Sequence, residues 1–143
     1  MGRLIIAVFF ASVTVASCGL NKSDKDKEKI IASCDKIMRI FQEGKFQDAI
    51  QKLKEISIID KSTIDTLTVT VKNQMRTLAS TYGNINSCEY IDEKTIKDFL
   101  IKRTYLLRFD KYYLRFNFTI YKSNSGWTVT GFKYDDEMDD LFK

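Results

Sequence analysis

The sequence contains no histidine and no proline, and it has only three cysteines and six glycines among 143 residues. Without histidine, the chain lacks the commonest general base of enzymes and the commonest zinc ligand. This absence argues against an enzyme, although carboxylates, tyrosine and lysine can also catalyse reactions. The three cysteines lie far apart, and no pair has the close spacing of a metal-binding motif. We therefore predict no metal site, no cofactor and no catalytic residue.

An apolar run near the start of the chain follows Arg3 and ends in Val15-Ala16-Ser17-Cys18. A basic start, a short apolar run and small residues before a cleavage point predict a secretory signal. The run is too short for a membrane-spanning helix, which needs about 20 apolar residues.

Because the run ends in cysteine, residues 1–18 resemble a bacterial lipoprotein signal. The resemblance implies cleavage before Cys18 and a lipid anchor on its sulfur, so that the partner of this end of the chain is a membrane. A plain secretory signal with an ordinary cleavage site is the alternative. Gly19 follows the lipid cysteine, where an Asp commonly retains lipoproteins of this type at the inner membrane. The resemblance therefore implies the periplasmic face of the outer membrane within the cell envelope.

Cleavage before Cys18 divides the chain into a signal (residues 1–17), a linker (residues 18–29) and one domain (residues 30–143). Removing 17 residues from 143 leaves 126, which is enough to bury a hydrophobic core. From Gly19 to Lys29 lysines alternate with acidic residues, and no large apolar residue follows Leu20. We therefore expect this linker to be flexible.

Two cysteines remain once Cys18 is assigned to the lipid. In an oxidising compartment Cys34 and Cys88 can form a disulfide. Such a bridge would close a loop of about 55 residues and contribute about 4 kcal/mol. The alternative is two buried, unpaired thiols that act as small hydrophobic side chains.

Apolar residues at helical spacing predict three helices in the first half of the chain. The first runs from Ile30 to Gly44, and the second begins at Phe46. Ser62, with Asp65 three residues later, suggests a capping box at the start of the third helix. Residues 66–71 alternate as in a strand, but the longer helical spacing favours a helix that ends near Gly83.

The second half of the chain is rich in aromatic residues, which favour strands. Of the 18 aromatic residues, 12 lie between Phe99 and Phe142. We predict strands over residues 84–91, 99–109, 112–122 and 127–134, paired as an antiparallel meander. In the second strand one face carries Phe99, Ile101, Tyr105, Leu107 and Phe109. In the third strand the apolar residues Leu114, Phe116, Phe118 and Ile120 alternate with more polar ones. The acidic tail that follows is either a short closing helix or a frayed end. Helices followed by strands indicate an α+β fold.

The order of these elements, with Gly44-Lys45-Phe46 between two helices and Gly126-Trp127 in the last hairpin, resembles the nuclear transport factor 2-like fold. The resemblance implies N-terminal helices packed on a curved antiparallel sheet of three to four strands, which together form a cone. A cystatin-like fold, with a single helix on a sheet, is the structural alternative. Enzymes of the first group place acid–base residues inside the cone. Ketosteroid isomerase relatives use Asp and Tyr, whereas dehydratase relatives use an Asp–His pair that this chain cannot supply.

Arg103 and Tyr105 are the candidate polar groups of a pocket, because they share a predicted strand face with Leu107 and Phe109. No carboxylate falls on that face in the strand pattern. We therefore expect Tyr105 to be a core tyrosine whose hydroxyl finds a hydrogen-bond partner at the edge of the core.

Tyr113, Arg115 and Tyr121 share one face of the following strand. Tyrosine and arginine are favoured in interfaces, so we predict that this face contacts a homodimer partner or another envelope protein. Six basic residues lie between Lys102 and Lys122, but a location in the envelope argues against a nucleic-acid partner. The sequence thus predicts a lipid-anchored, non-enzymatic envelope protein that binds a partner protein or a small apolar ligand. The alternative is a cone-fold enzyme, of isomerase or hydrolase type, that uses tyrosine and carboxylate groups.

Overall fold

The computed structural model describes residues 21–143, in which three helices precede a four-stranded antiparallel sheet. The helices are α1 (Lys22–Gln42), α2 (Phe46–Ile56) and α3 (Lys61–Tyr82). The strands β1 (Ile85–Ile96), β2 (Leu100–Phe109), β3 (Tyr113–Ser123) and β4 (Gly126–Asp135) follow one another across the sheet in sequence order. A short 3-10 helix, η1 (Asp139–Leu141), lies near the end of the chain. These elements confirm the predicted α+β class.

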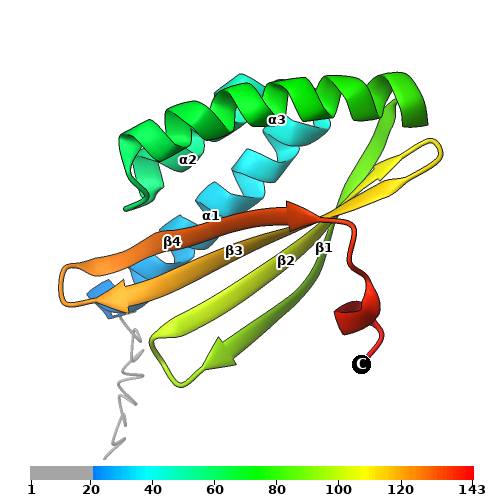
Figure 1. Cartoon of the computed structure of the whole chain (residues 1–143). Helices are drawn as coiled ribbons and strands as arrows, with labels where there is room; N and C mark the ends of the chain where they lie inside the picture. The colour runs from blue at the N-terminus through cyan, green and yellow to red at the C-terminus, as the bar shows by residue number, and fades with distance from the viewer. Residues whose placement is uncertain (1–20) are drawn as a thin grey trace, which may run out of the picture.

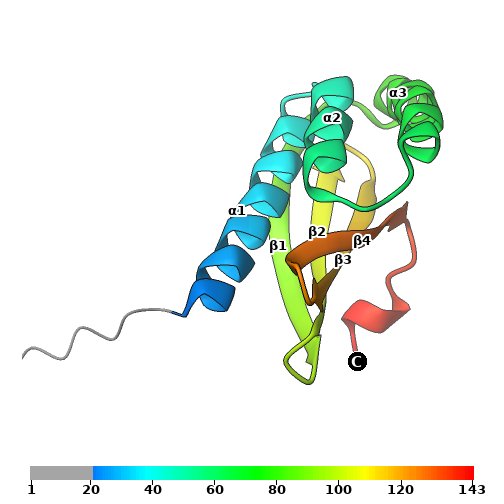
Figure 2. The same cartoon turned by 90° about the vertical axis from the view of Figure 1, so that its left-hand side faces the viewer.

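The helices form one layer on one face of the curved sheet, and the C-terminal tail lies on the other (Figures 1 and 2). We call the face under the helices the inner face and the opposite one the outer face. On β3 the alternation predicted from the sequence holds, because the inner side chains are buried: Leu114, Phe116, Phe118 and Ile120. From α1, the ring of Phe41 lies 5.0 Å from that of Phe116 and 6.1 Å from that of Phe132. Each such ring stabilises the core by roughly 1.5–3 kcal/mol.

The first helix begins eight residues before the predicted Ile30, so the predicted flexible linker is wrong from Lys22 on. Lysine and glutamate are good helix formers, and this end of α1 also packs on the sheet. The ammonium of Lys27 lies 4.0 Å from Glu93 Oε1 of β1 and 5.9 Å from the ring centroid of Trp127 in β4. The predicted signal (residues 1–17) and Cys18 lie outside the described residues.

The third helix confirms the helical interpretation of residues 66–71, where threonines alternate with apolar residues. The hydroxyls of Thr66, Thr68 and Thr70 donate to carbonyls four residues earlier in the helix, which satisfies them without a strand. The predicted capping box is wrong. Asp60 caps this helix by accepting hydrogen bonds from the backbone N–H groups of Ser62 and Thr63, and Asp65 instead pairs with Lys54 of α2 at 2.8 Å.

Candidate binding site

Arg103 and Tyr105 lie on the inner face of β2, beneath α1, and they form one polar cluster. Tyr105 Oη donates a hydrogen bond to Asp35 Oδ1 of α1 at 2.5 Å, and Arg103 Nε donates to Tyr105 Oη at 2.6 Å. The guanidinium also donates to Asp35 Oδ1 at 2.9 Å and to Glu93 Oε2 of β1 at 2.8 Å. The structure thus brings the two predicted pocket residues together, and it adds two carboxylates that the strand pattern missed.

The electrostatics of this cluster fix its protonation states. Burial and the hydrogen bond to Asp35 raise the pKa of Tyr105 well above its usual range, so the phenol stays protonated and acts as a donor. Burial opposes the charge of Arg103, but hydrogen bonds with Asp35 and Tyr105 raise its pKa overall. The ring of Tyr90 covers the guanidinium, with Arg103 Cζ 4.2 Å from the ring centroid, which adds a cation–π attraction. The cluster is therefore a closed ion-pair network at neutral pH.

A hollow of about 330 Å³ opens over this network. Its lining comes from α1 and from the first two strands: Asp35, Met38, Arg39, Cys88, Tyr90, Arg103 and Tyr105. The Asp35 side chain is 39% exposed, whereas that of Arg103 is 12% exposed. Solvent therefore reaches the carboxylate, but the phenol and the guanidinium are already engaged with their neighbours.

Cys34 and Cys88 are both free thiols in the structure. Cys34 is fully buried on α1, and Cys88 is half-buried on β1. Burial raises the pKa of each thiol to about 12, and such protonated thiols are poor nucleophiles. In the structure the two cysteines therefore act as small hydrophobic side chains, and a disulfide between them stays a prediction.

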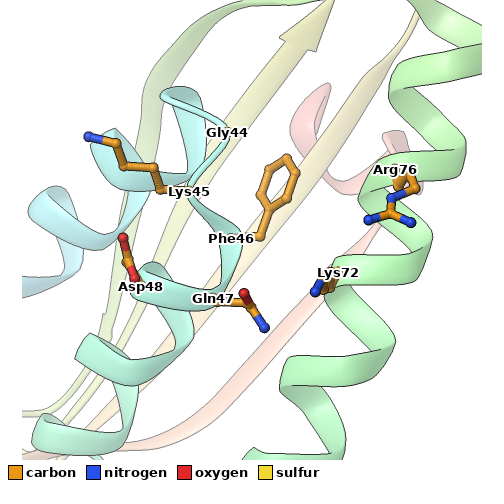
Figure 3. A pocket seen from close by; sticks show the side chains of 7 residues that line it. All are labelled: Gly44, Lys45, Phe46, Gln47, Asp48, Lys72 and Arg76. Atoms are coloured by element: carbon orange, nitrogen blue, oxygen red, sulfur yellow. The ribbon is translucent and has the colours of Figure 1, made fainter.

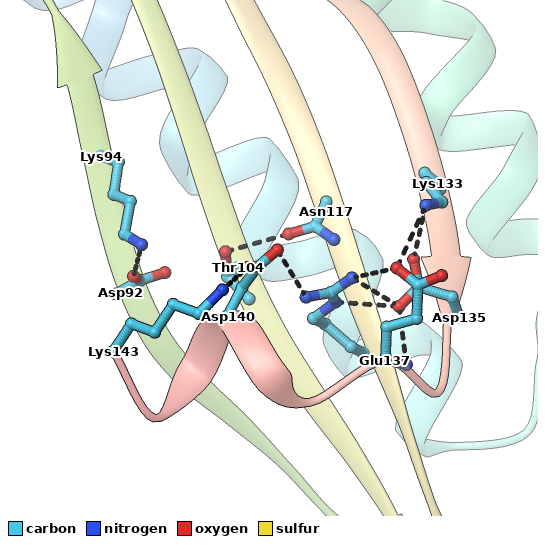
Figure 4. Close-up of polar contacts among 10 residues, drawn as sticks. Asp92, Lys94, Thr104, Asn117, Lys133, Asp135, Glu137, Asp140 and Lys143 are labelled. Carbon is cyan, nitrogen blue, oxygen red and sulfur yellow. Dashed lines mark hydrogen bonds and ion pairs between the residues drawn. The ribbon is translucent and has the colours of Figure 1, made fainter.

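Arg115, the central residue of the predicted interface, is buried on the outer face of the sheet. Its side chain is only 4% exposed, and the C-terminal tail, with Glu137 and Asp140, folds back over this face (Figure 4). Its guanidinium lies 2.8 Å from Asp135 Oδ1, 3.4 Å from Glu137 Oε2 and 3.7 Å from Asp140 Oδ2. We call these three carboxylates around Arg115 the C-terminal clasp. Of the two forms predicted for the tail, the structure has the short helix, η1.

Tyr113 and Tyr121 do not form one patch with Arg115. Each is 40% exposed, but they lie near opposite ends of β3. Tyr113 stacks on Tyr112 with a centroid distance of 5.1 Å, whereas Tyr121 contacts Phe99 at 6.3 Å. The three residues therefore do not form one exposed patch, since Arg115 is buried and the two tyrosines contact different neighbours. A contact with a homodimer partner or an envelope protein stays a prediction. No local pattern around Arg115 indicated that a tail 20 residues later would cover it.

A groove of about 420 Å³ lies between α3 and the adjoining ends of β3 and β4. Leu78 of α3, Leu114 of β3 and Tyr134 of β4 supply its apolar lining, and we call it the α3 groove. The Tyr134 hydroxyl donates to Gln74 Oε1 of α3, and its ring stacks on Phe116 at 5.5 Å. Polar side chains form the rest of the lining: Asn73, Gln74, Thr77, Asp135 and Asp136. The sequence analysis missed this site, because its residues come from three separate elements.

A third hollow, of about 370 Å³, lies between the start of α2 and α3 (Figure 3). Its basic side chains are Lys45, Lys72 and Arg76, all three of which are exposed. Lys45 already pairs with Glu43 at 2.7 Å. We interpret this hollow as a solvated surface between two helices.

Comparison with known proteins finds no matching family model and no significant match among curated proteins or solved structures. Within residues 21–143, no helix is long and apolar enough to cross a bilayer. The same residues contain no group of three or more Cys, Asp or Glu side chains placed to hold a metal ion.

Proposed function

We propose that this protein is a lipid-anchored, non-enzymatic binding protein of the cell envelope, and that the α3 groove takes a small apolar ligand. The α3 groove is the observation that carries this proposal. A hollow of a few hundred Å³ with an apolar lining and a few polar groups is typical of small-molecule sites. The polar rim, with Gln74 on one side and Asp136 on the other, would orient a ligand whose apolar part contacts Leu78 and Leu114.

The finer fold in this proposal is the nuclear transport factor 2-like cone. Three helices on one face of a curved, four-stranded sheet support it over the single helix of a cystatin-like fold. Aromatic side chains fill the space between the helices and the sheet. Phe41, Phe116 and Phe118 are among them, and all three are fully buried. A filled interior supports binding at a groove over catalysis in a deep pocket.

Ligand binding is tested with the neutral, apolar dye N-phenyl-1-naphthylamine, whose fluorescence rises in apolar surroundings. We expect the wild-type protein to bind the dye and Leu78→Lys to bind it several-fold more weakly, because a charge in the groove opposes apolar contact. Val69→Lys is the matched control, since Val69 lies on α3 and is already 60% exposed. If wild type and Leu78→Lys bind the dye equally, and circular dichroism shows that both are folded, the proposal that the α3 groove is the binding site is contradicted.

The lipid anchor is tested by metabolic fatty-acid labelling of wild type and Cys18→Ala, followed by membrane fractionation. We expect the label to be lost in the variant. Label that persists in Cys18→Ala contradicts the anchor, and label on an inner-membrane fraction contradicts the outer-membrane location.

The runner-up function is an enzyme of the same fold. It is favoured by the contact between Tyr105 and the half-exposed Asp35 in an open hollow. In enzymes of this kind a carboxylate moves a proton and a tyrosine stabilises the negative charge that develops on the substrate. The test is turnover of a β,γ-unsaturated ketone and of a chromogenic ester by wild type, Tyr105→Phe and Asp35→Asn. Turnover in wild type that both variants lose would favour the enzyme over the binding protein.

A further inference from the structure

One end of the domain gathers the start of α1 and two hairpin turns, and we call it the N-terminal pole. It comprises Lys22–Lys27 of α1, the β1–β2 turn (96–99) and the β3–β4 turn (121–127). The backbone N–H of Lys122 donates to the carbonyl of Phe99 at 2.8 Å, which joins the two turns. Lys27 of α1 lies over Trp127, which joins the helix to them. Figure 1 shows these segments together at one end of the sheet.

The N-terminal pole exposes large apolar side chains. Ile96 is 59% exposed, Phe99 is 41% exposed and Tyr121 is 40% exposed. The sequence pattern placed Phe99 on the inner face, but β2 begins at Leu100 and Phe99 lies in the turn. Apolar side chains grouped on a surface mark a site of contact. Turns, by contrast, are usually made of polar residues, glycine and proline.

The same pole carries a net positive charge, because its segments contain five lysines and three aspartates. Among the described residues, Lys22, Lys25 and Lys97 have no carboxylate within 4.0 Å. Lys97 lies at the tip of the β1–β2 turn, between Ile96 and Asp98. Lysine next to exposed aliphatic and aromatic side chains is the combination found where proteins rest on anionic lipid. Tyrosine favours the headgroup level of a bilayer, and Tyr121 is exposed at this pole.

The length of chain between the anchor and the domain places this pole beside the membrane. This step rests on the proposed lipidation of Cys18. Two residues, Gly19 and Leu20, separate Cys18 from Asn21, where the described chain begins, so the Cα atoms of Cys18 and Asn21 are at most about 11 Å apart. Since α1 starts at Lys22, no long linker lifts the domain away. We propose that the N-terminal pole rests on the bilayer surface, with Ile96 and Phe99 inserted among the headgroups of anionic phospholipid.

The test uses single-tryptophan variants of the full-length protein, expressed with its signal and reconstituted into phosphatidylglycerol–phosphatidylcholine vesicles with brominated acyl chains. Trp127 is the sole tryptophan of the sequence, so Trp127→Phe provides the background. Phe99→Trp places the probe at the pole, and Val69→Trp places a matched, exposed probe on α3. We expect bromine to quench the Phe99→Trp probe several-fold more strongly than the Val69→Trp probe. Adding Ile96→Ser should weaken that quenching.

Mass spectrometry of the same samples, which detects the lipid on Cys18, separates this proposal from the anchor. A lipidated protein whose Phe99→Trp probe is quenched no more than the Val69→Trp probe overturns the membrane-facing pole and leaves the anchor in place. A non-lipidated protein whose Phe99→Trp probe is selectively quenched on added vesicles supports the pole and overturns the anchor. A protein with neither lipid nor quenching overturns both. Thermal unfolding of each variant establishes that it is folded.

Discussion

Arg103 connects three elements through a single side chain. It holds Asp35 of α1, Glu93 of β1 and Tyr105 of its own strand. Arg103 and Tyr105 lost most of their contact with water on folding. The hydrogen bonds of the network therefore matter less for their net gain than for the penalty of leaving one of these two groups unpaired. Tyr90, stacked on the guanidinium, shields the network further. The network therefore fixes how α1 sits on the edge of the sheet.

Tyr105→Phe should lower the free energy of unfolding by about 1–2 kcal/mol, because it removes one donor to Asp35 and leaves Arg103 Nε without an acceptor. Urea denaturation followed by circular dichroism measures this change. Tyr121→Phe is the control, since the hydroxyl of Tyr121 makes no hydrogen bond within the described residues and its ring is 40% exposed. An equal loss in both variants would show that the network contributes nothing to stability.

At the scale of elements, the third helix ends because Gly83 adopts a positive φ of 86°. Asp110 closes this end by accepting a hydrogen bond from Asn84 N at 2.8 Å. A Cβ at position 83 would lie 2.9 Å from Asp110 Cγ, which is closer than real Cβ contacts allow. Two costs therefore coincide at this residue, one from the backbone conformation and one from the neighbour.

Gly83→Ala and Gly44→Ala together separate these two costs. Gly44 also has a positive φ, of 75°, but a Cβ there would meet no atom within 4 Å. We expect Gly44→Ala to cost about 1–2 kcal/mol from backbone strain alone, and Gly83→Ala to cost more. Thermal or urea unfolding measures both. Equal losses would contradict a steric role for Asp110.

The elements also show which features a sequence can predict. The alternation of Leu114, Phe116, Phe118 and Ile120 placed β3 correctly, because a period of two is a local property of the chain. The contact of Asp35 with Arg103 was not predictable in this way, since it joins residues 68 positions apart and depends on how α1 docks. The start of α1 was missed for the same reason: the charged residues before Ile30 lack an apolar stripe, and their helix is held by contacts with Glu93 and Trp127.

At the scale of the whole molecule, the C-terminal clasp closes the outer face of the sheet. Burying a guanidinium is costly unless carboxylates compensate its charge, and Arg115 finds them only in the last nine residues. Beside it, Thr104 Oγ1 donates to Asn117 Oδ1 at 3.0 Å, so a second polar pair is also buried under the tail (Figure 4). The burial of polar groups on the outer face thus depends on the C-terminal tail, for which the sequence pattern predicted only a short helix or a frayed end.

The clasp should make stability depend on acid. Burial tends to raise the pKa of Asp135, but the hydrogen bond from Lys133 and the charge of Arg115 lower it overall. The hydrogen bond from Lys143 lowers the pKa of Asp140. A carboxyl whose pKa is lower in the folded state than its ordinary value of 3.8 stabilises the fold at pH values above 3.8. That stabilisation is lost as the pH falls through the lower, folded-state pKa.

Asp135→Asn should therefore cost about 2 kcal/mol at pH 7 and flatten the decline of stability below pH 4. Urea unfolding at several pH values between 7 and 2.5 measures both effects. Asp139→Asn is the control, because Asp139 lies in η1 without an ion-pair partner among the described residues. A wild-type protein and an Asp135→Asn variant with parallel pH profiles would contradict the clasp.

The packing of Phe41 against Phe116 and Phe132 also sets the order in which the chain can fold. A ribosome makes α1 first, but isolated helices of this kind are only marginally stable in water, and the rings that bury Phe41 belong to the last two strands. The helices can therefore pack on one another early, through Phe41 and Phe46, but they lack the sheet that completes their burial. The hydrophobic core can close only after the last strand has been synthesised.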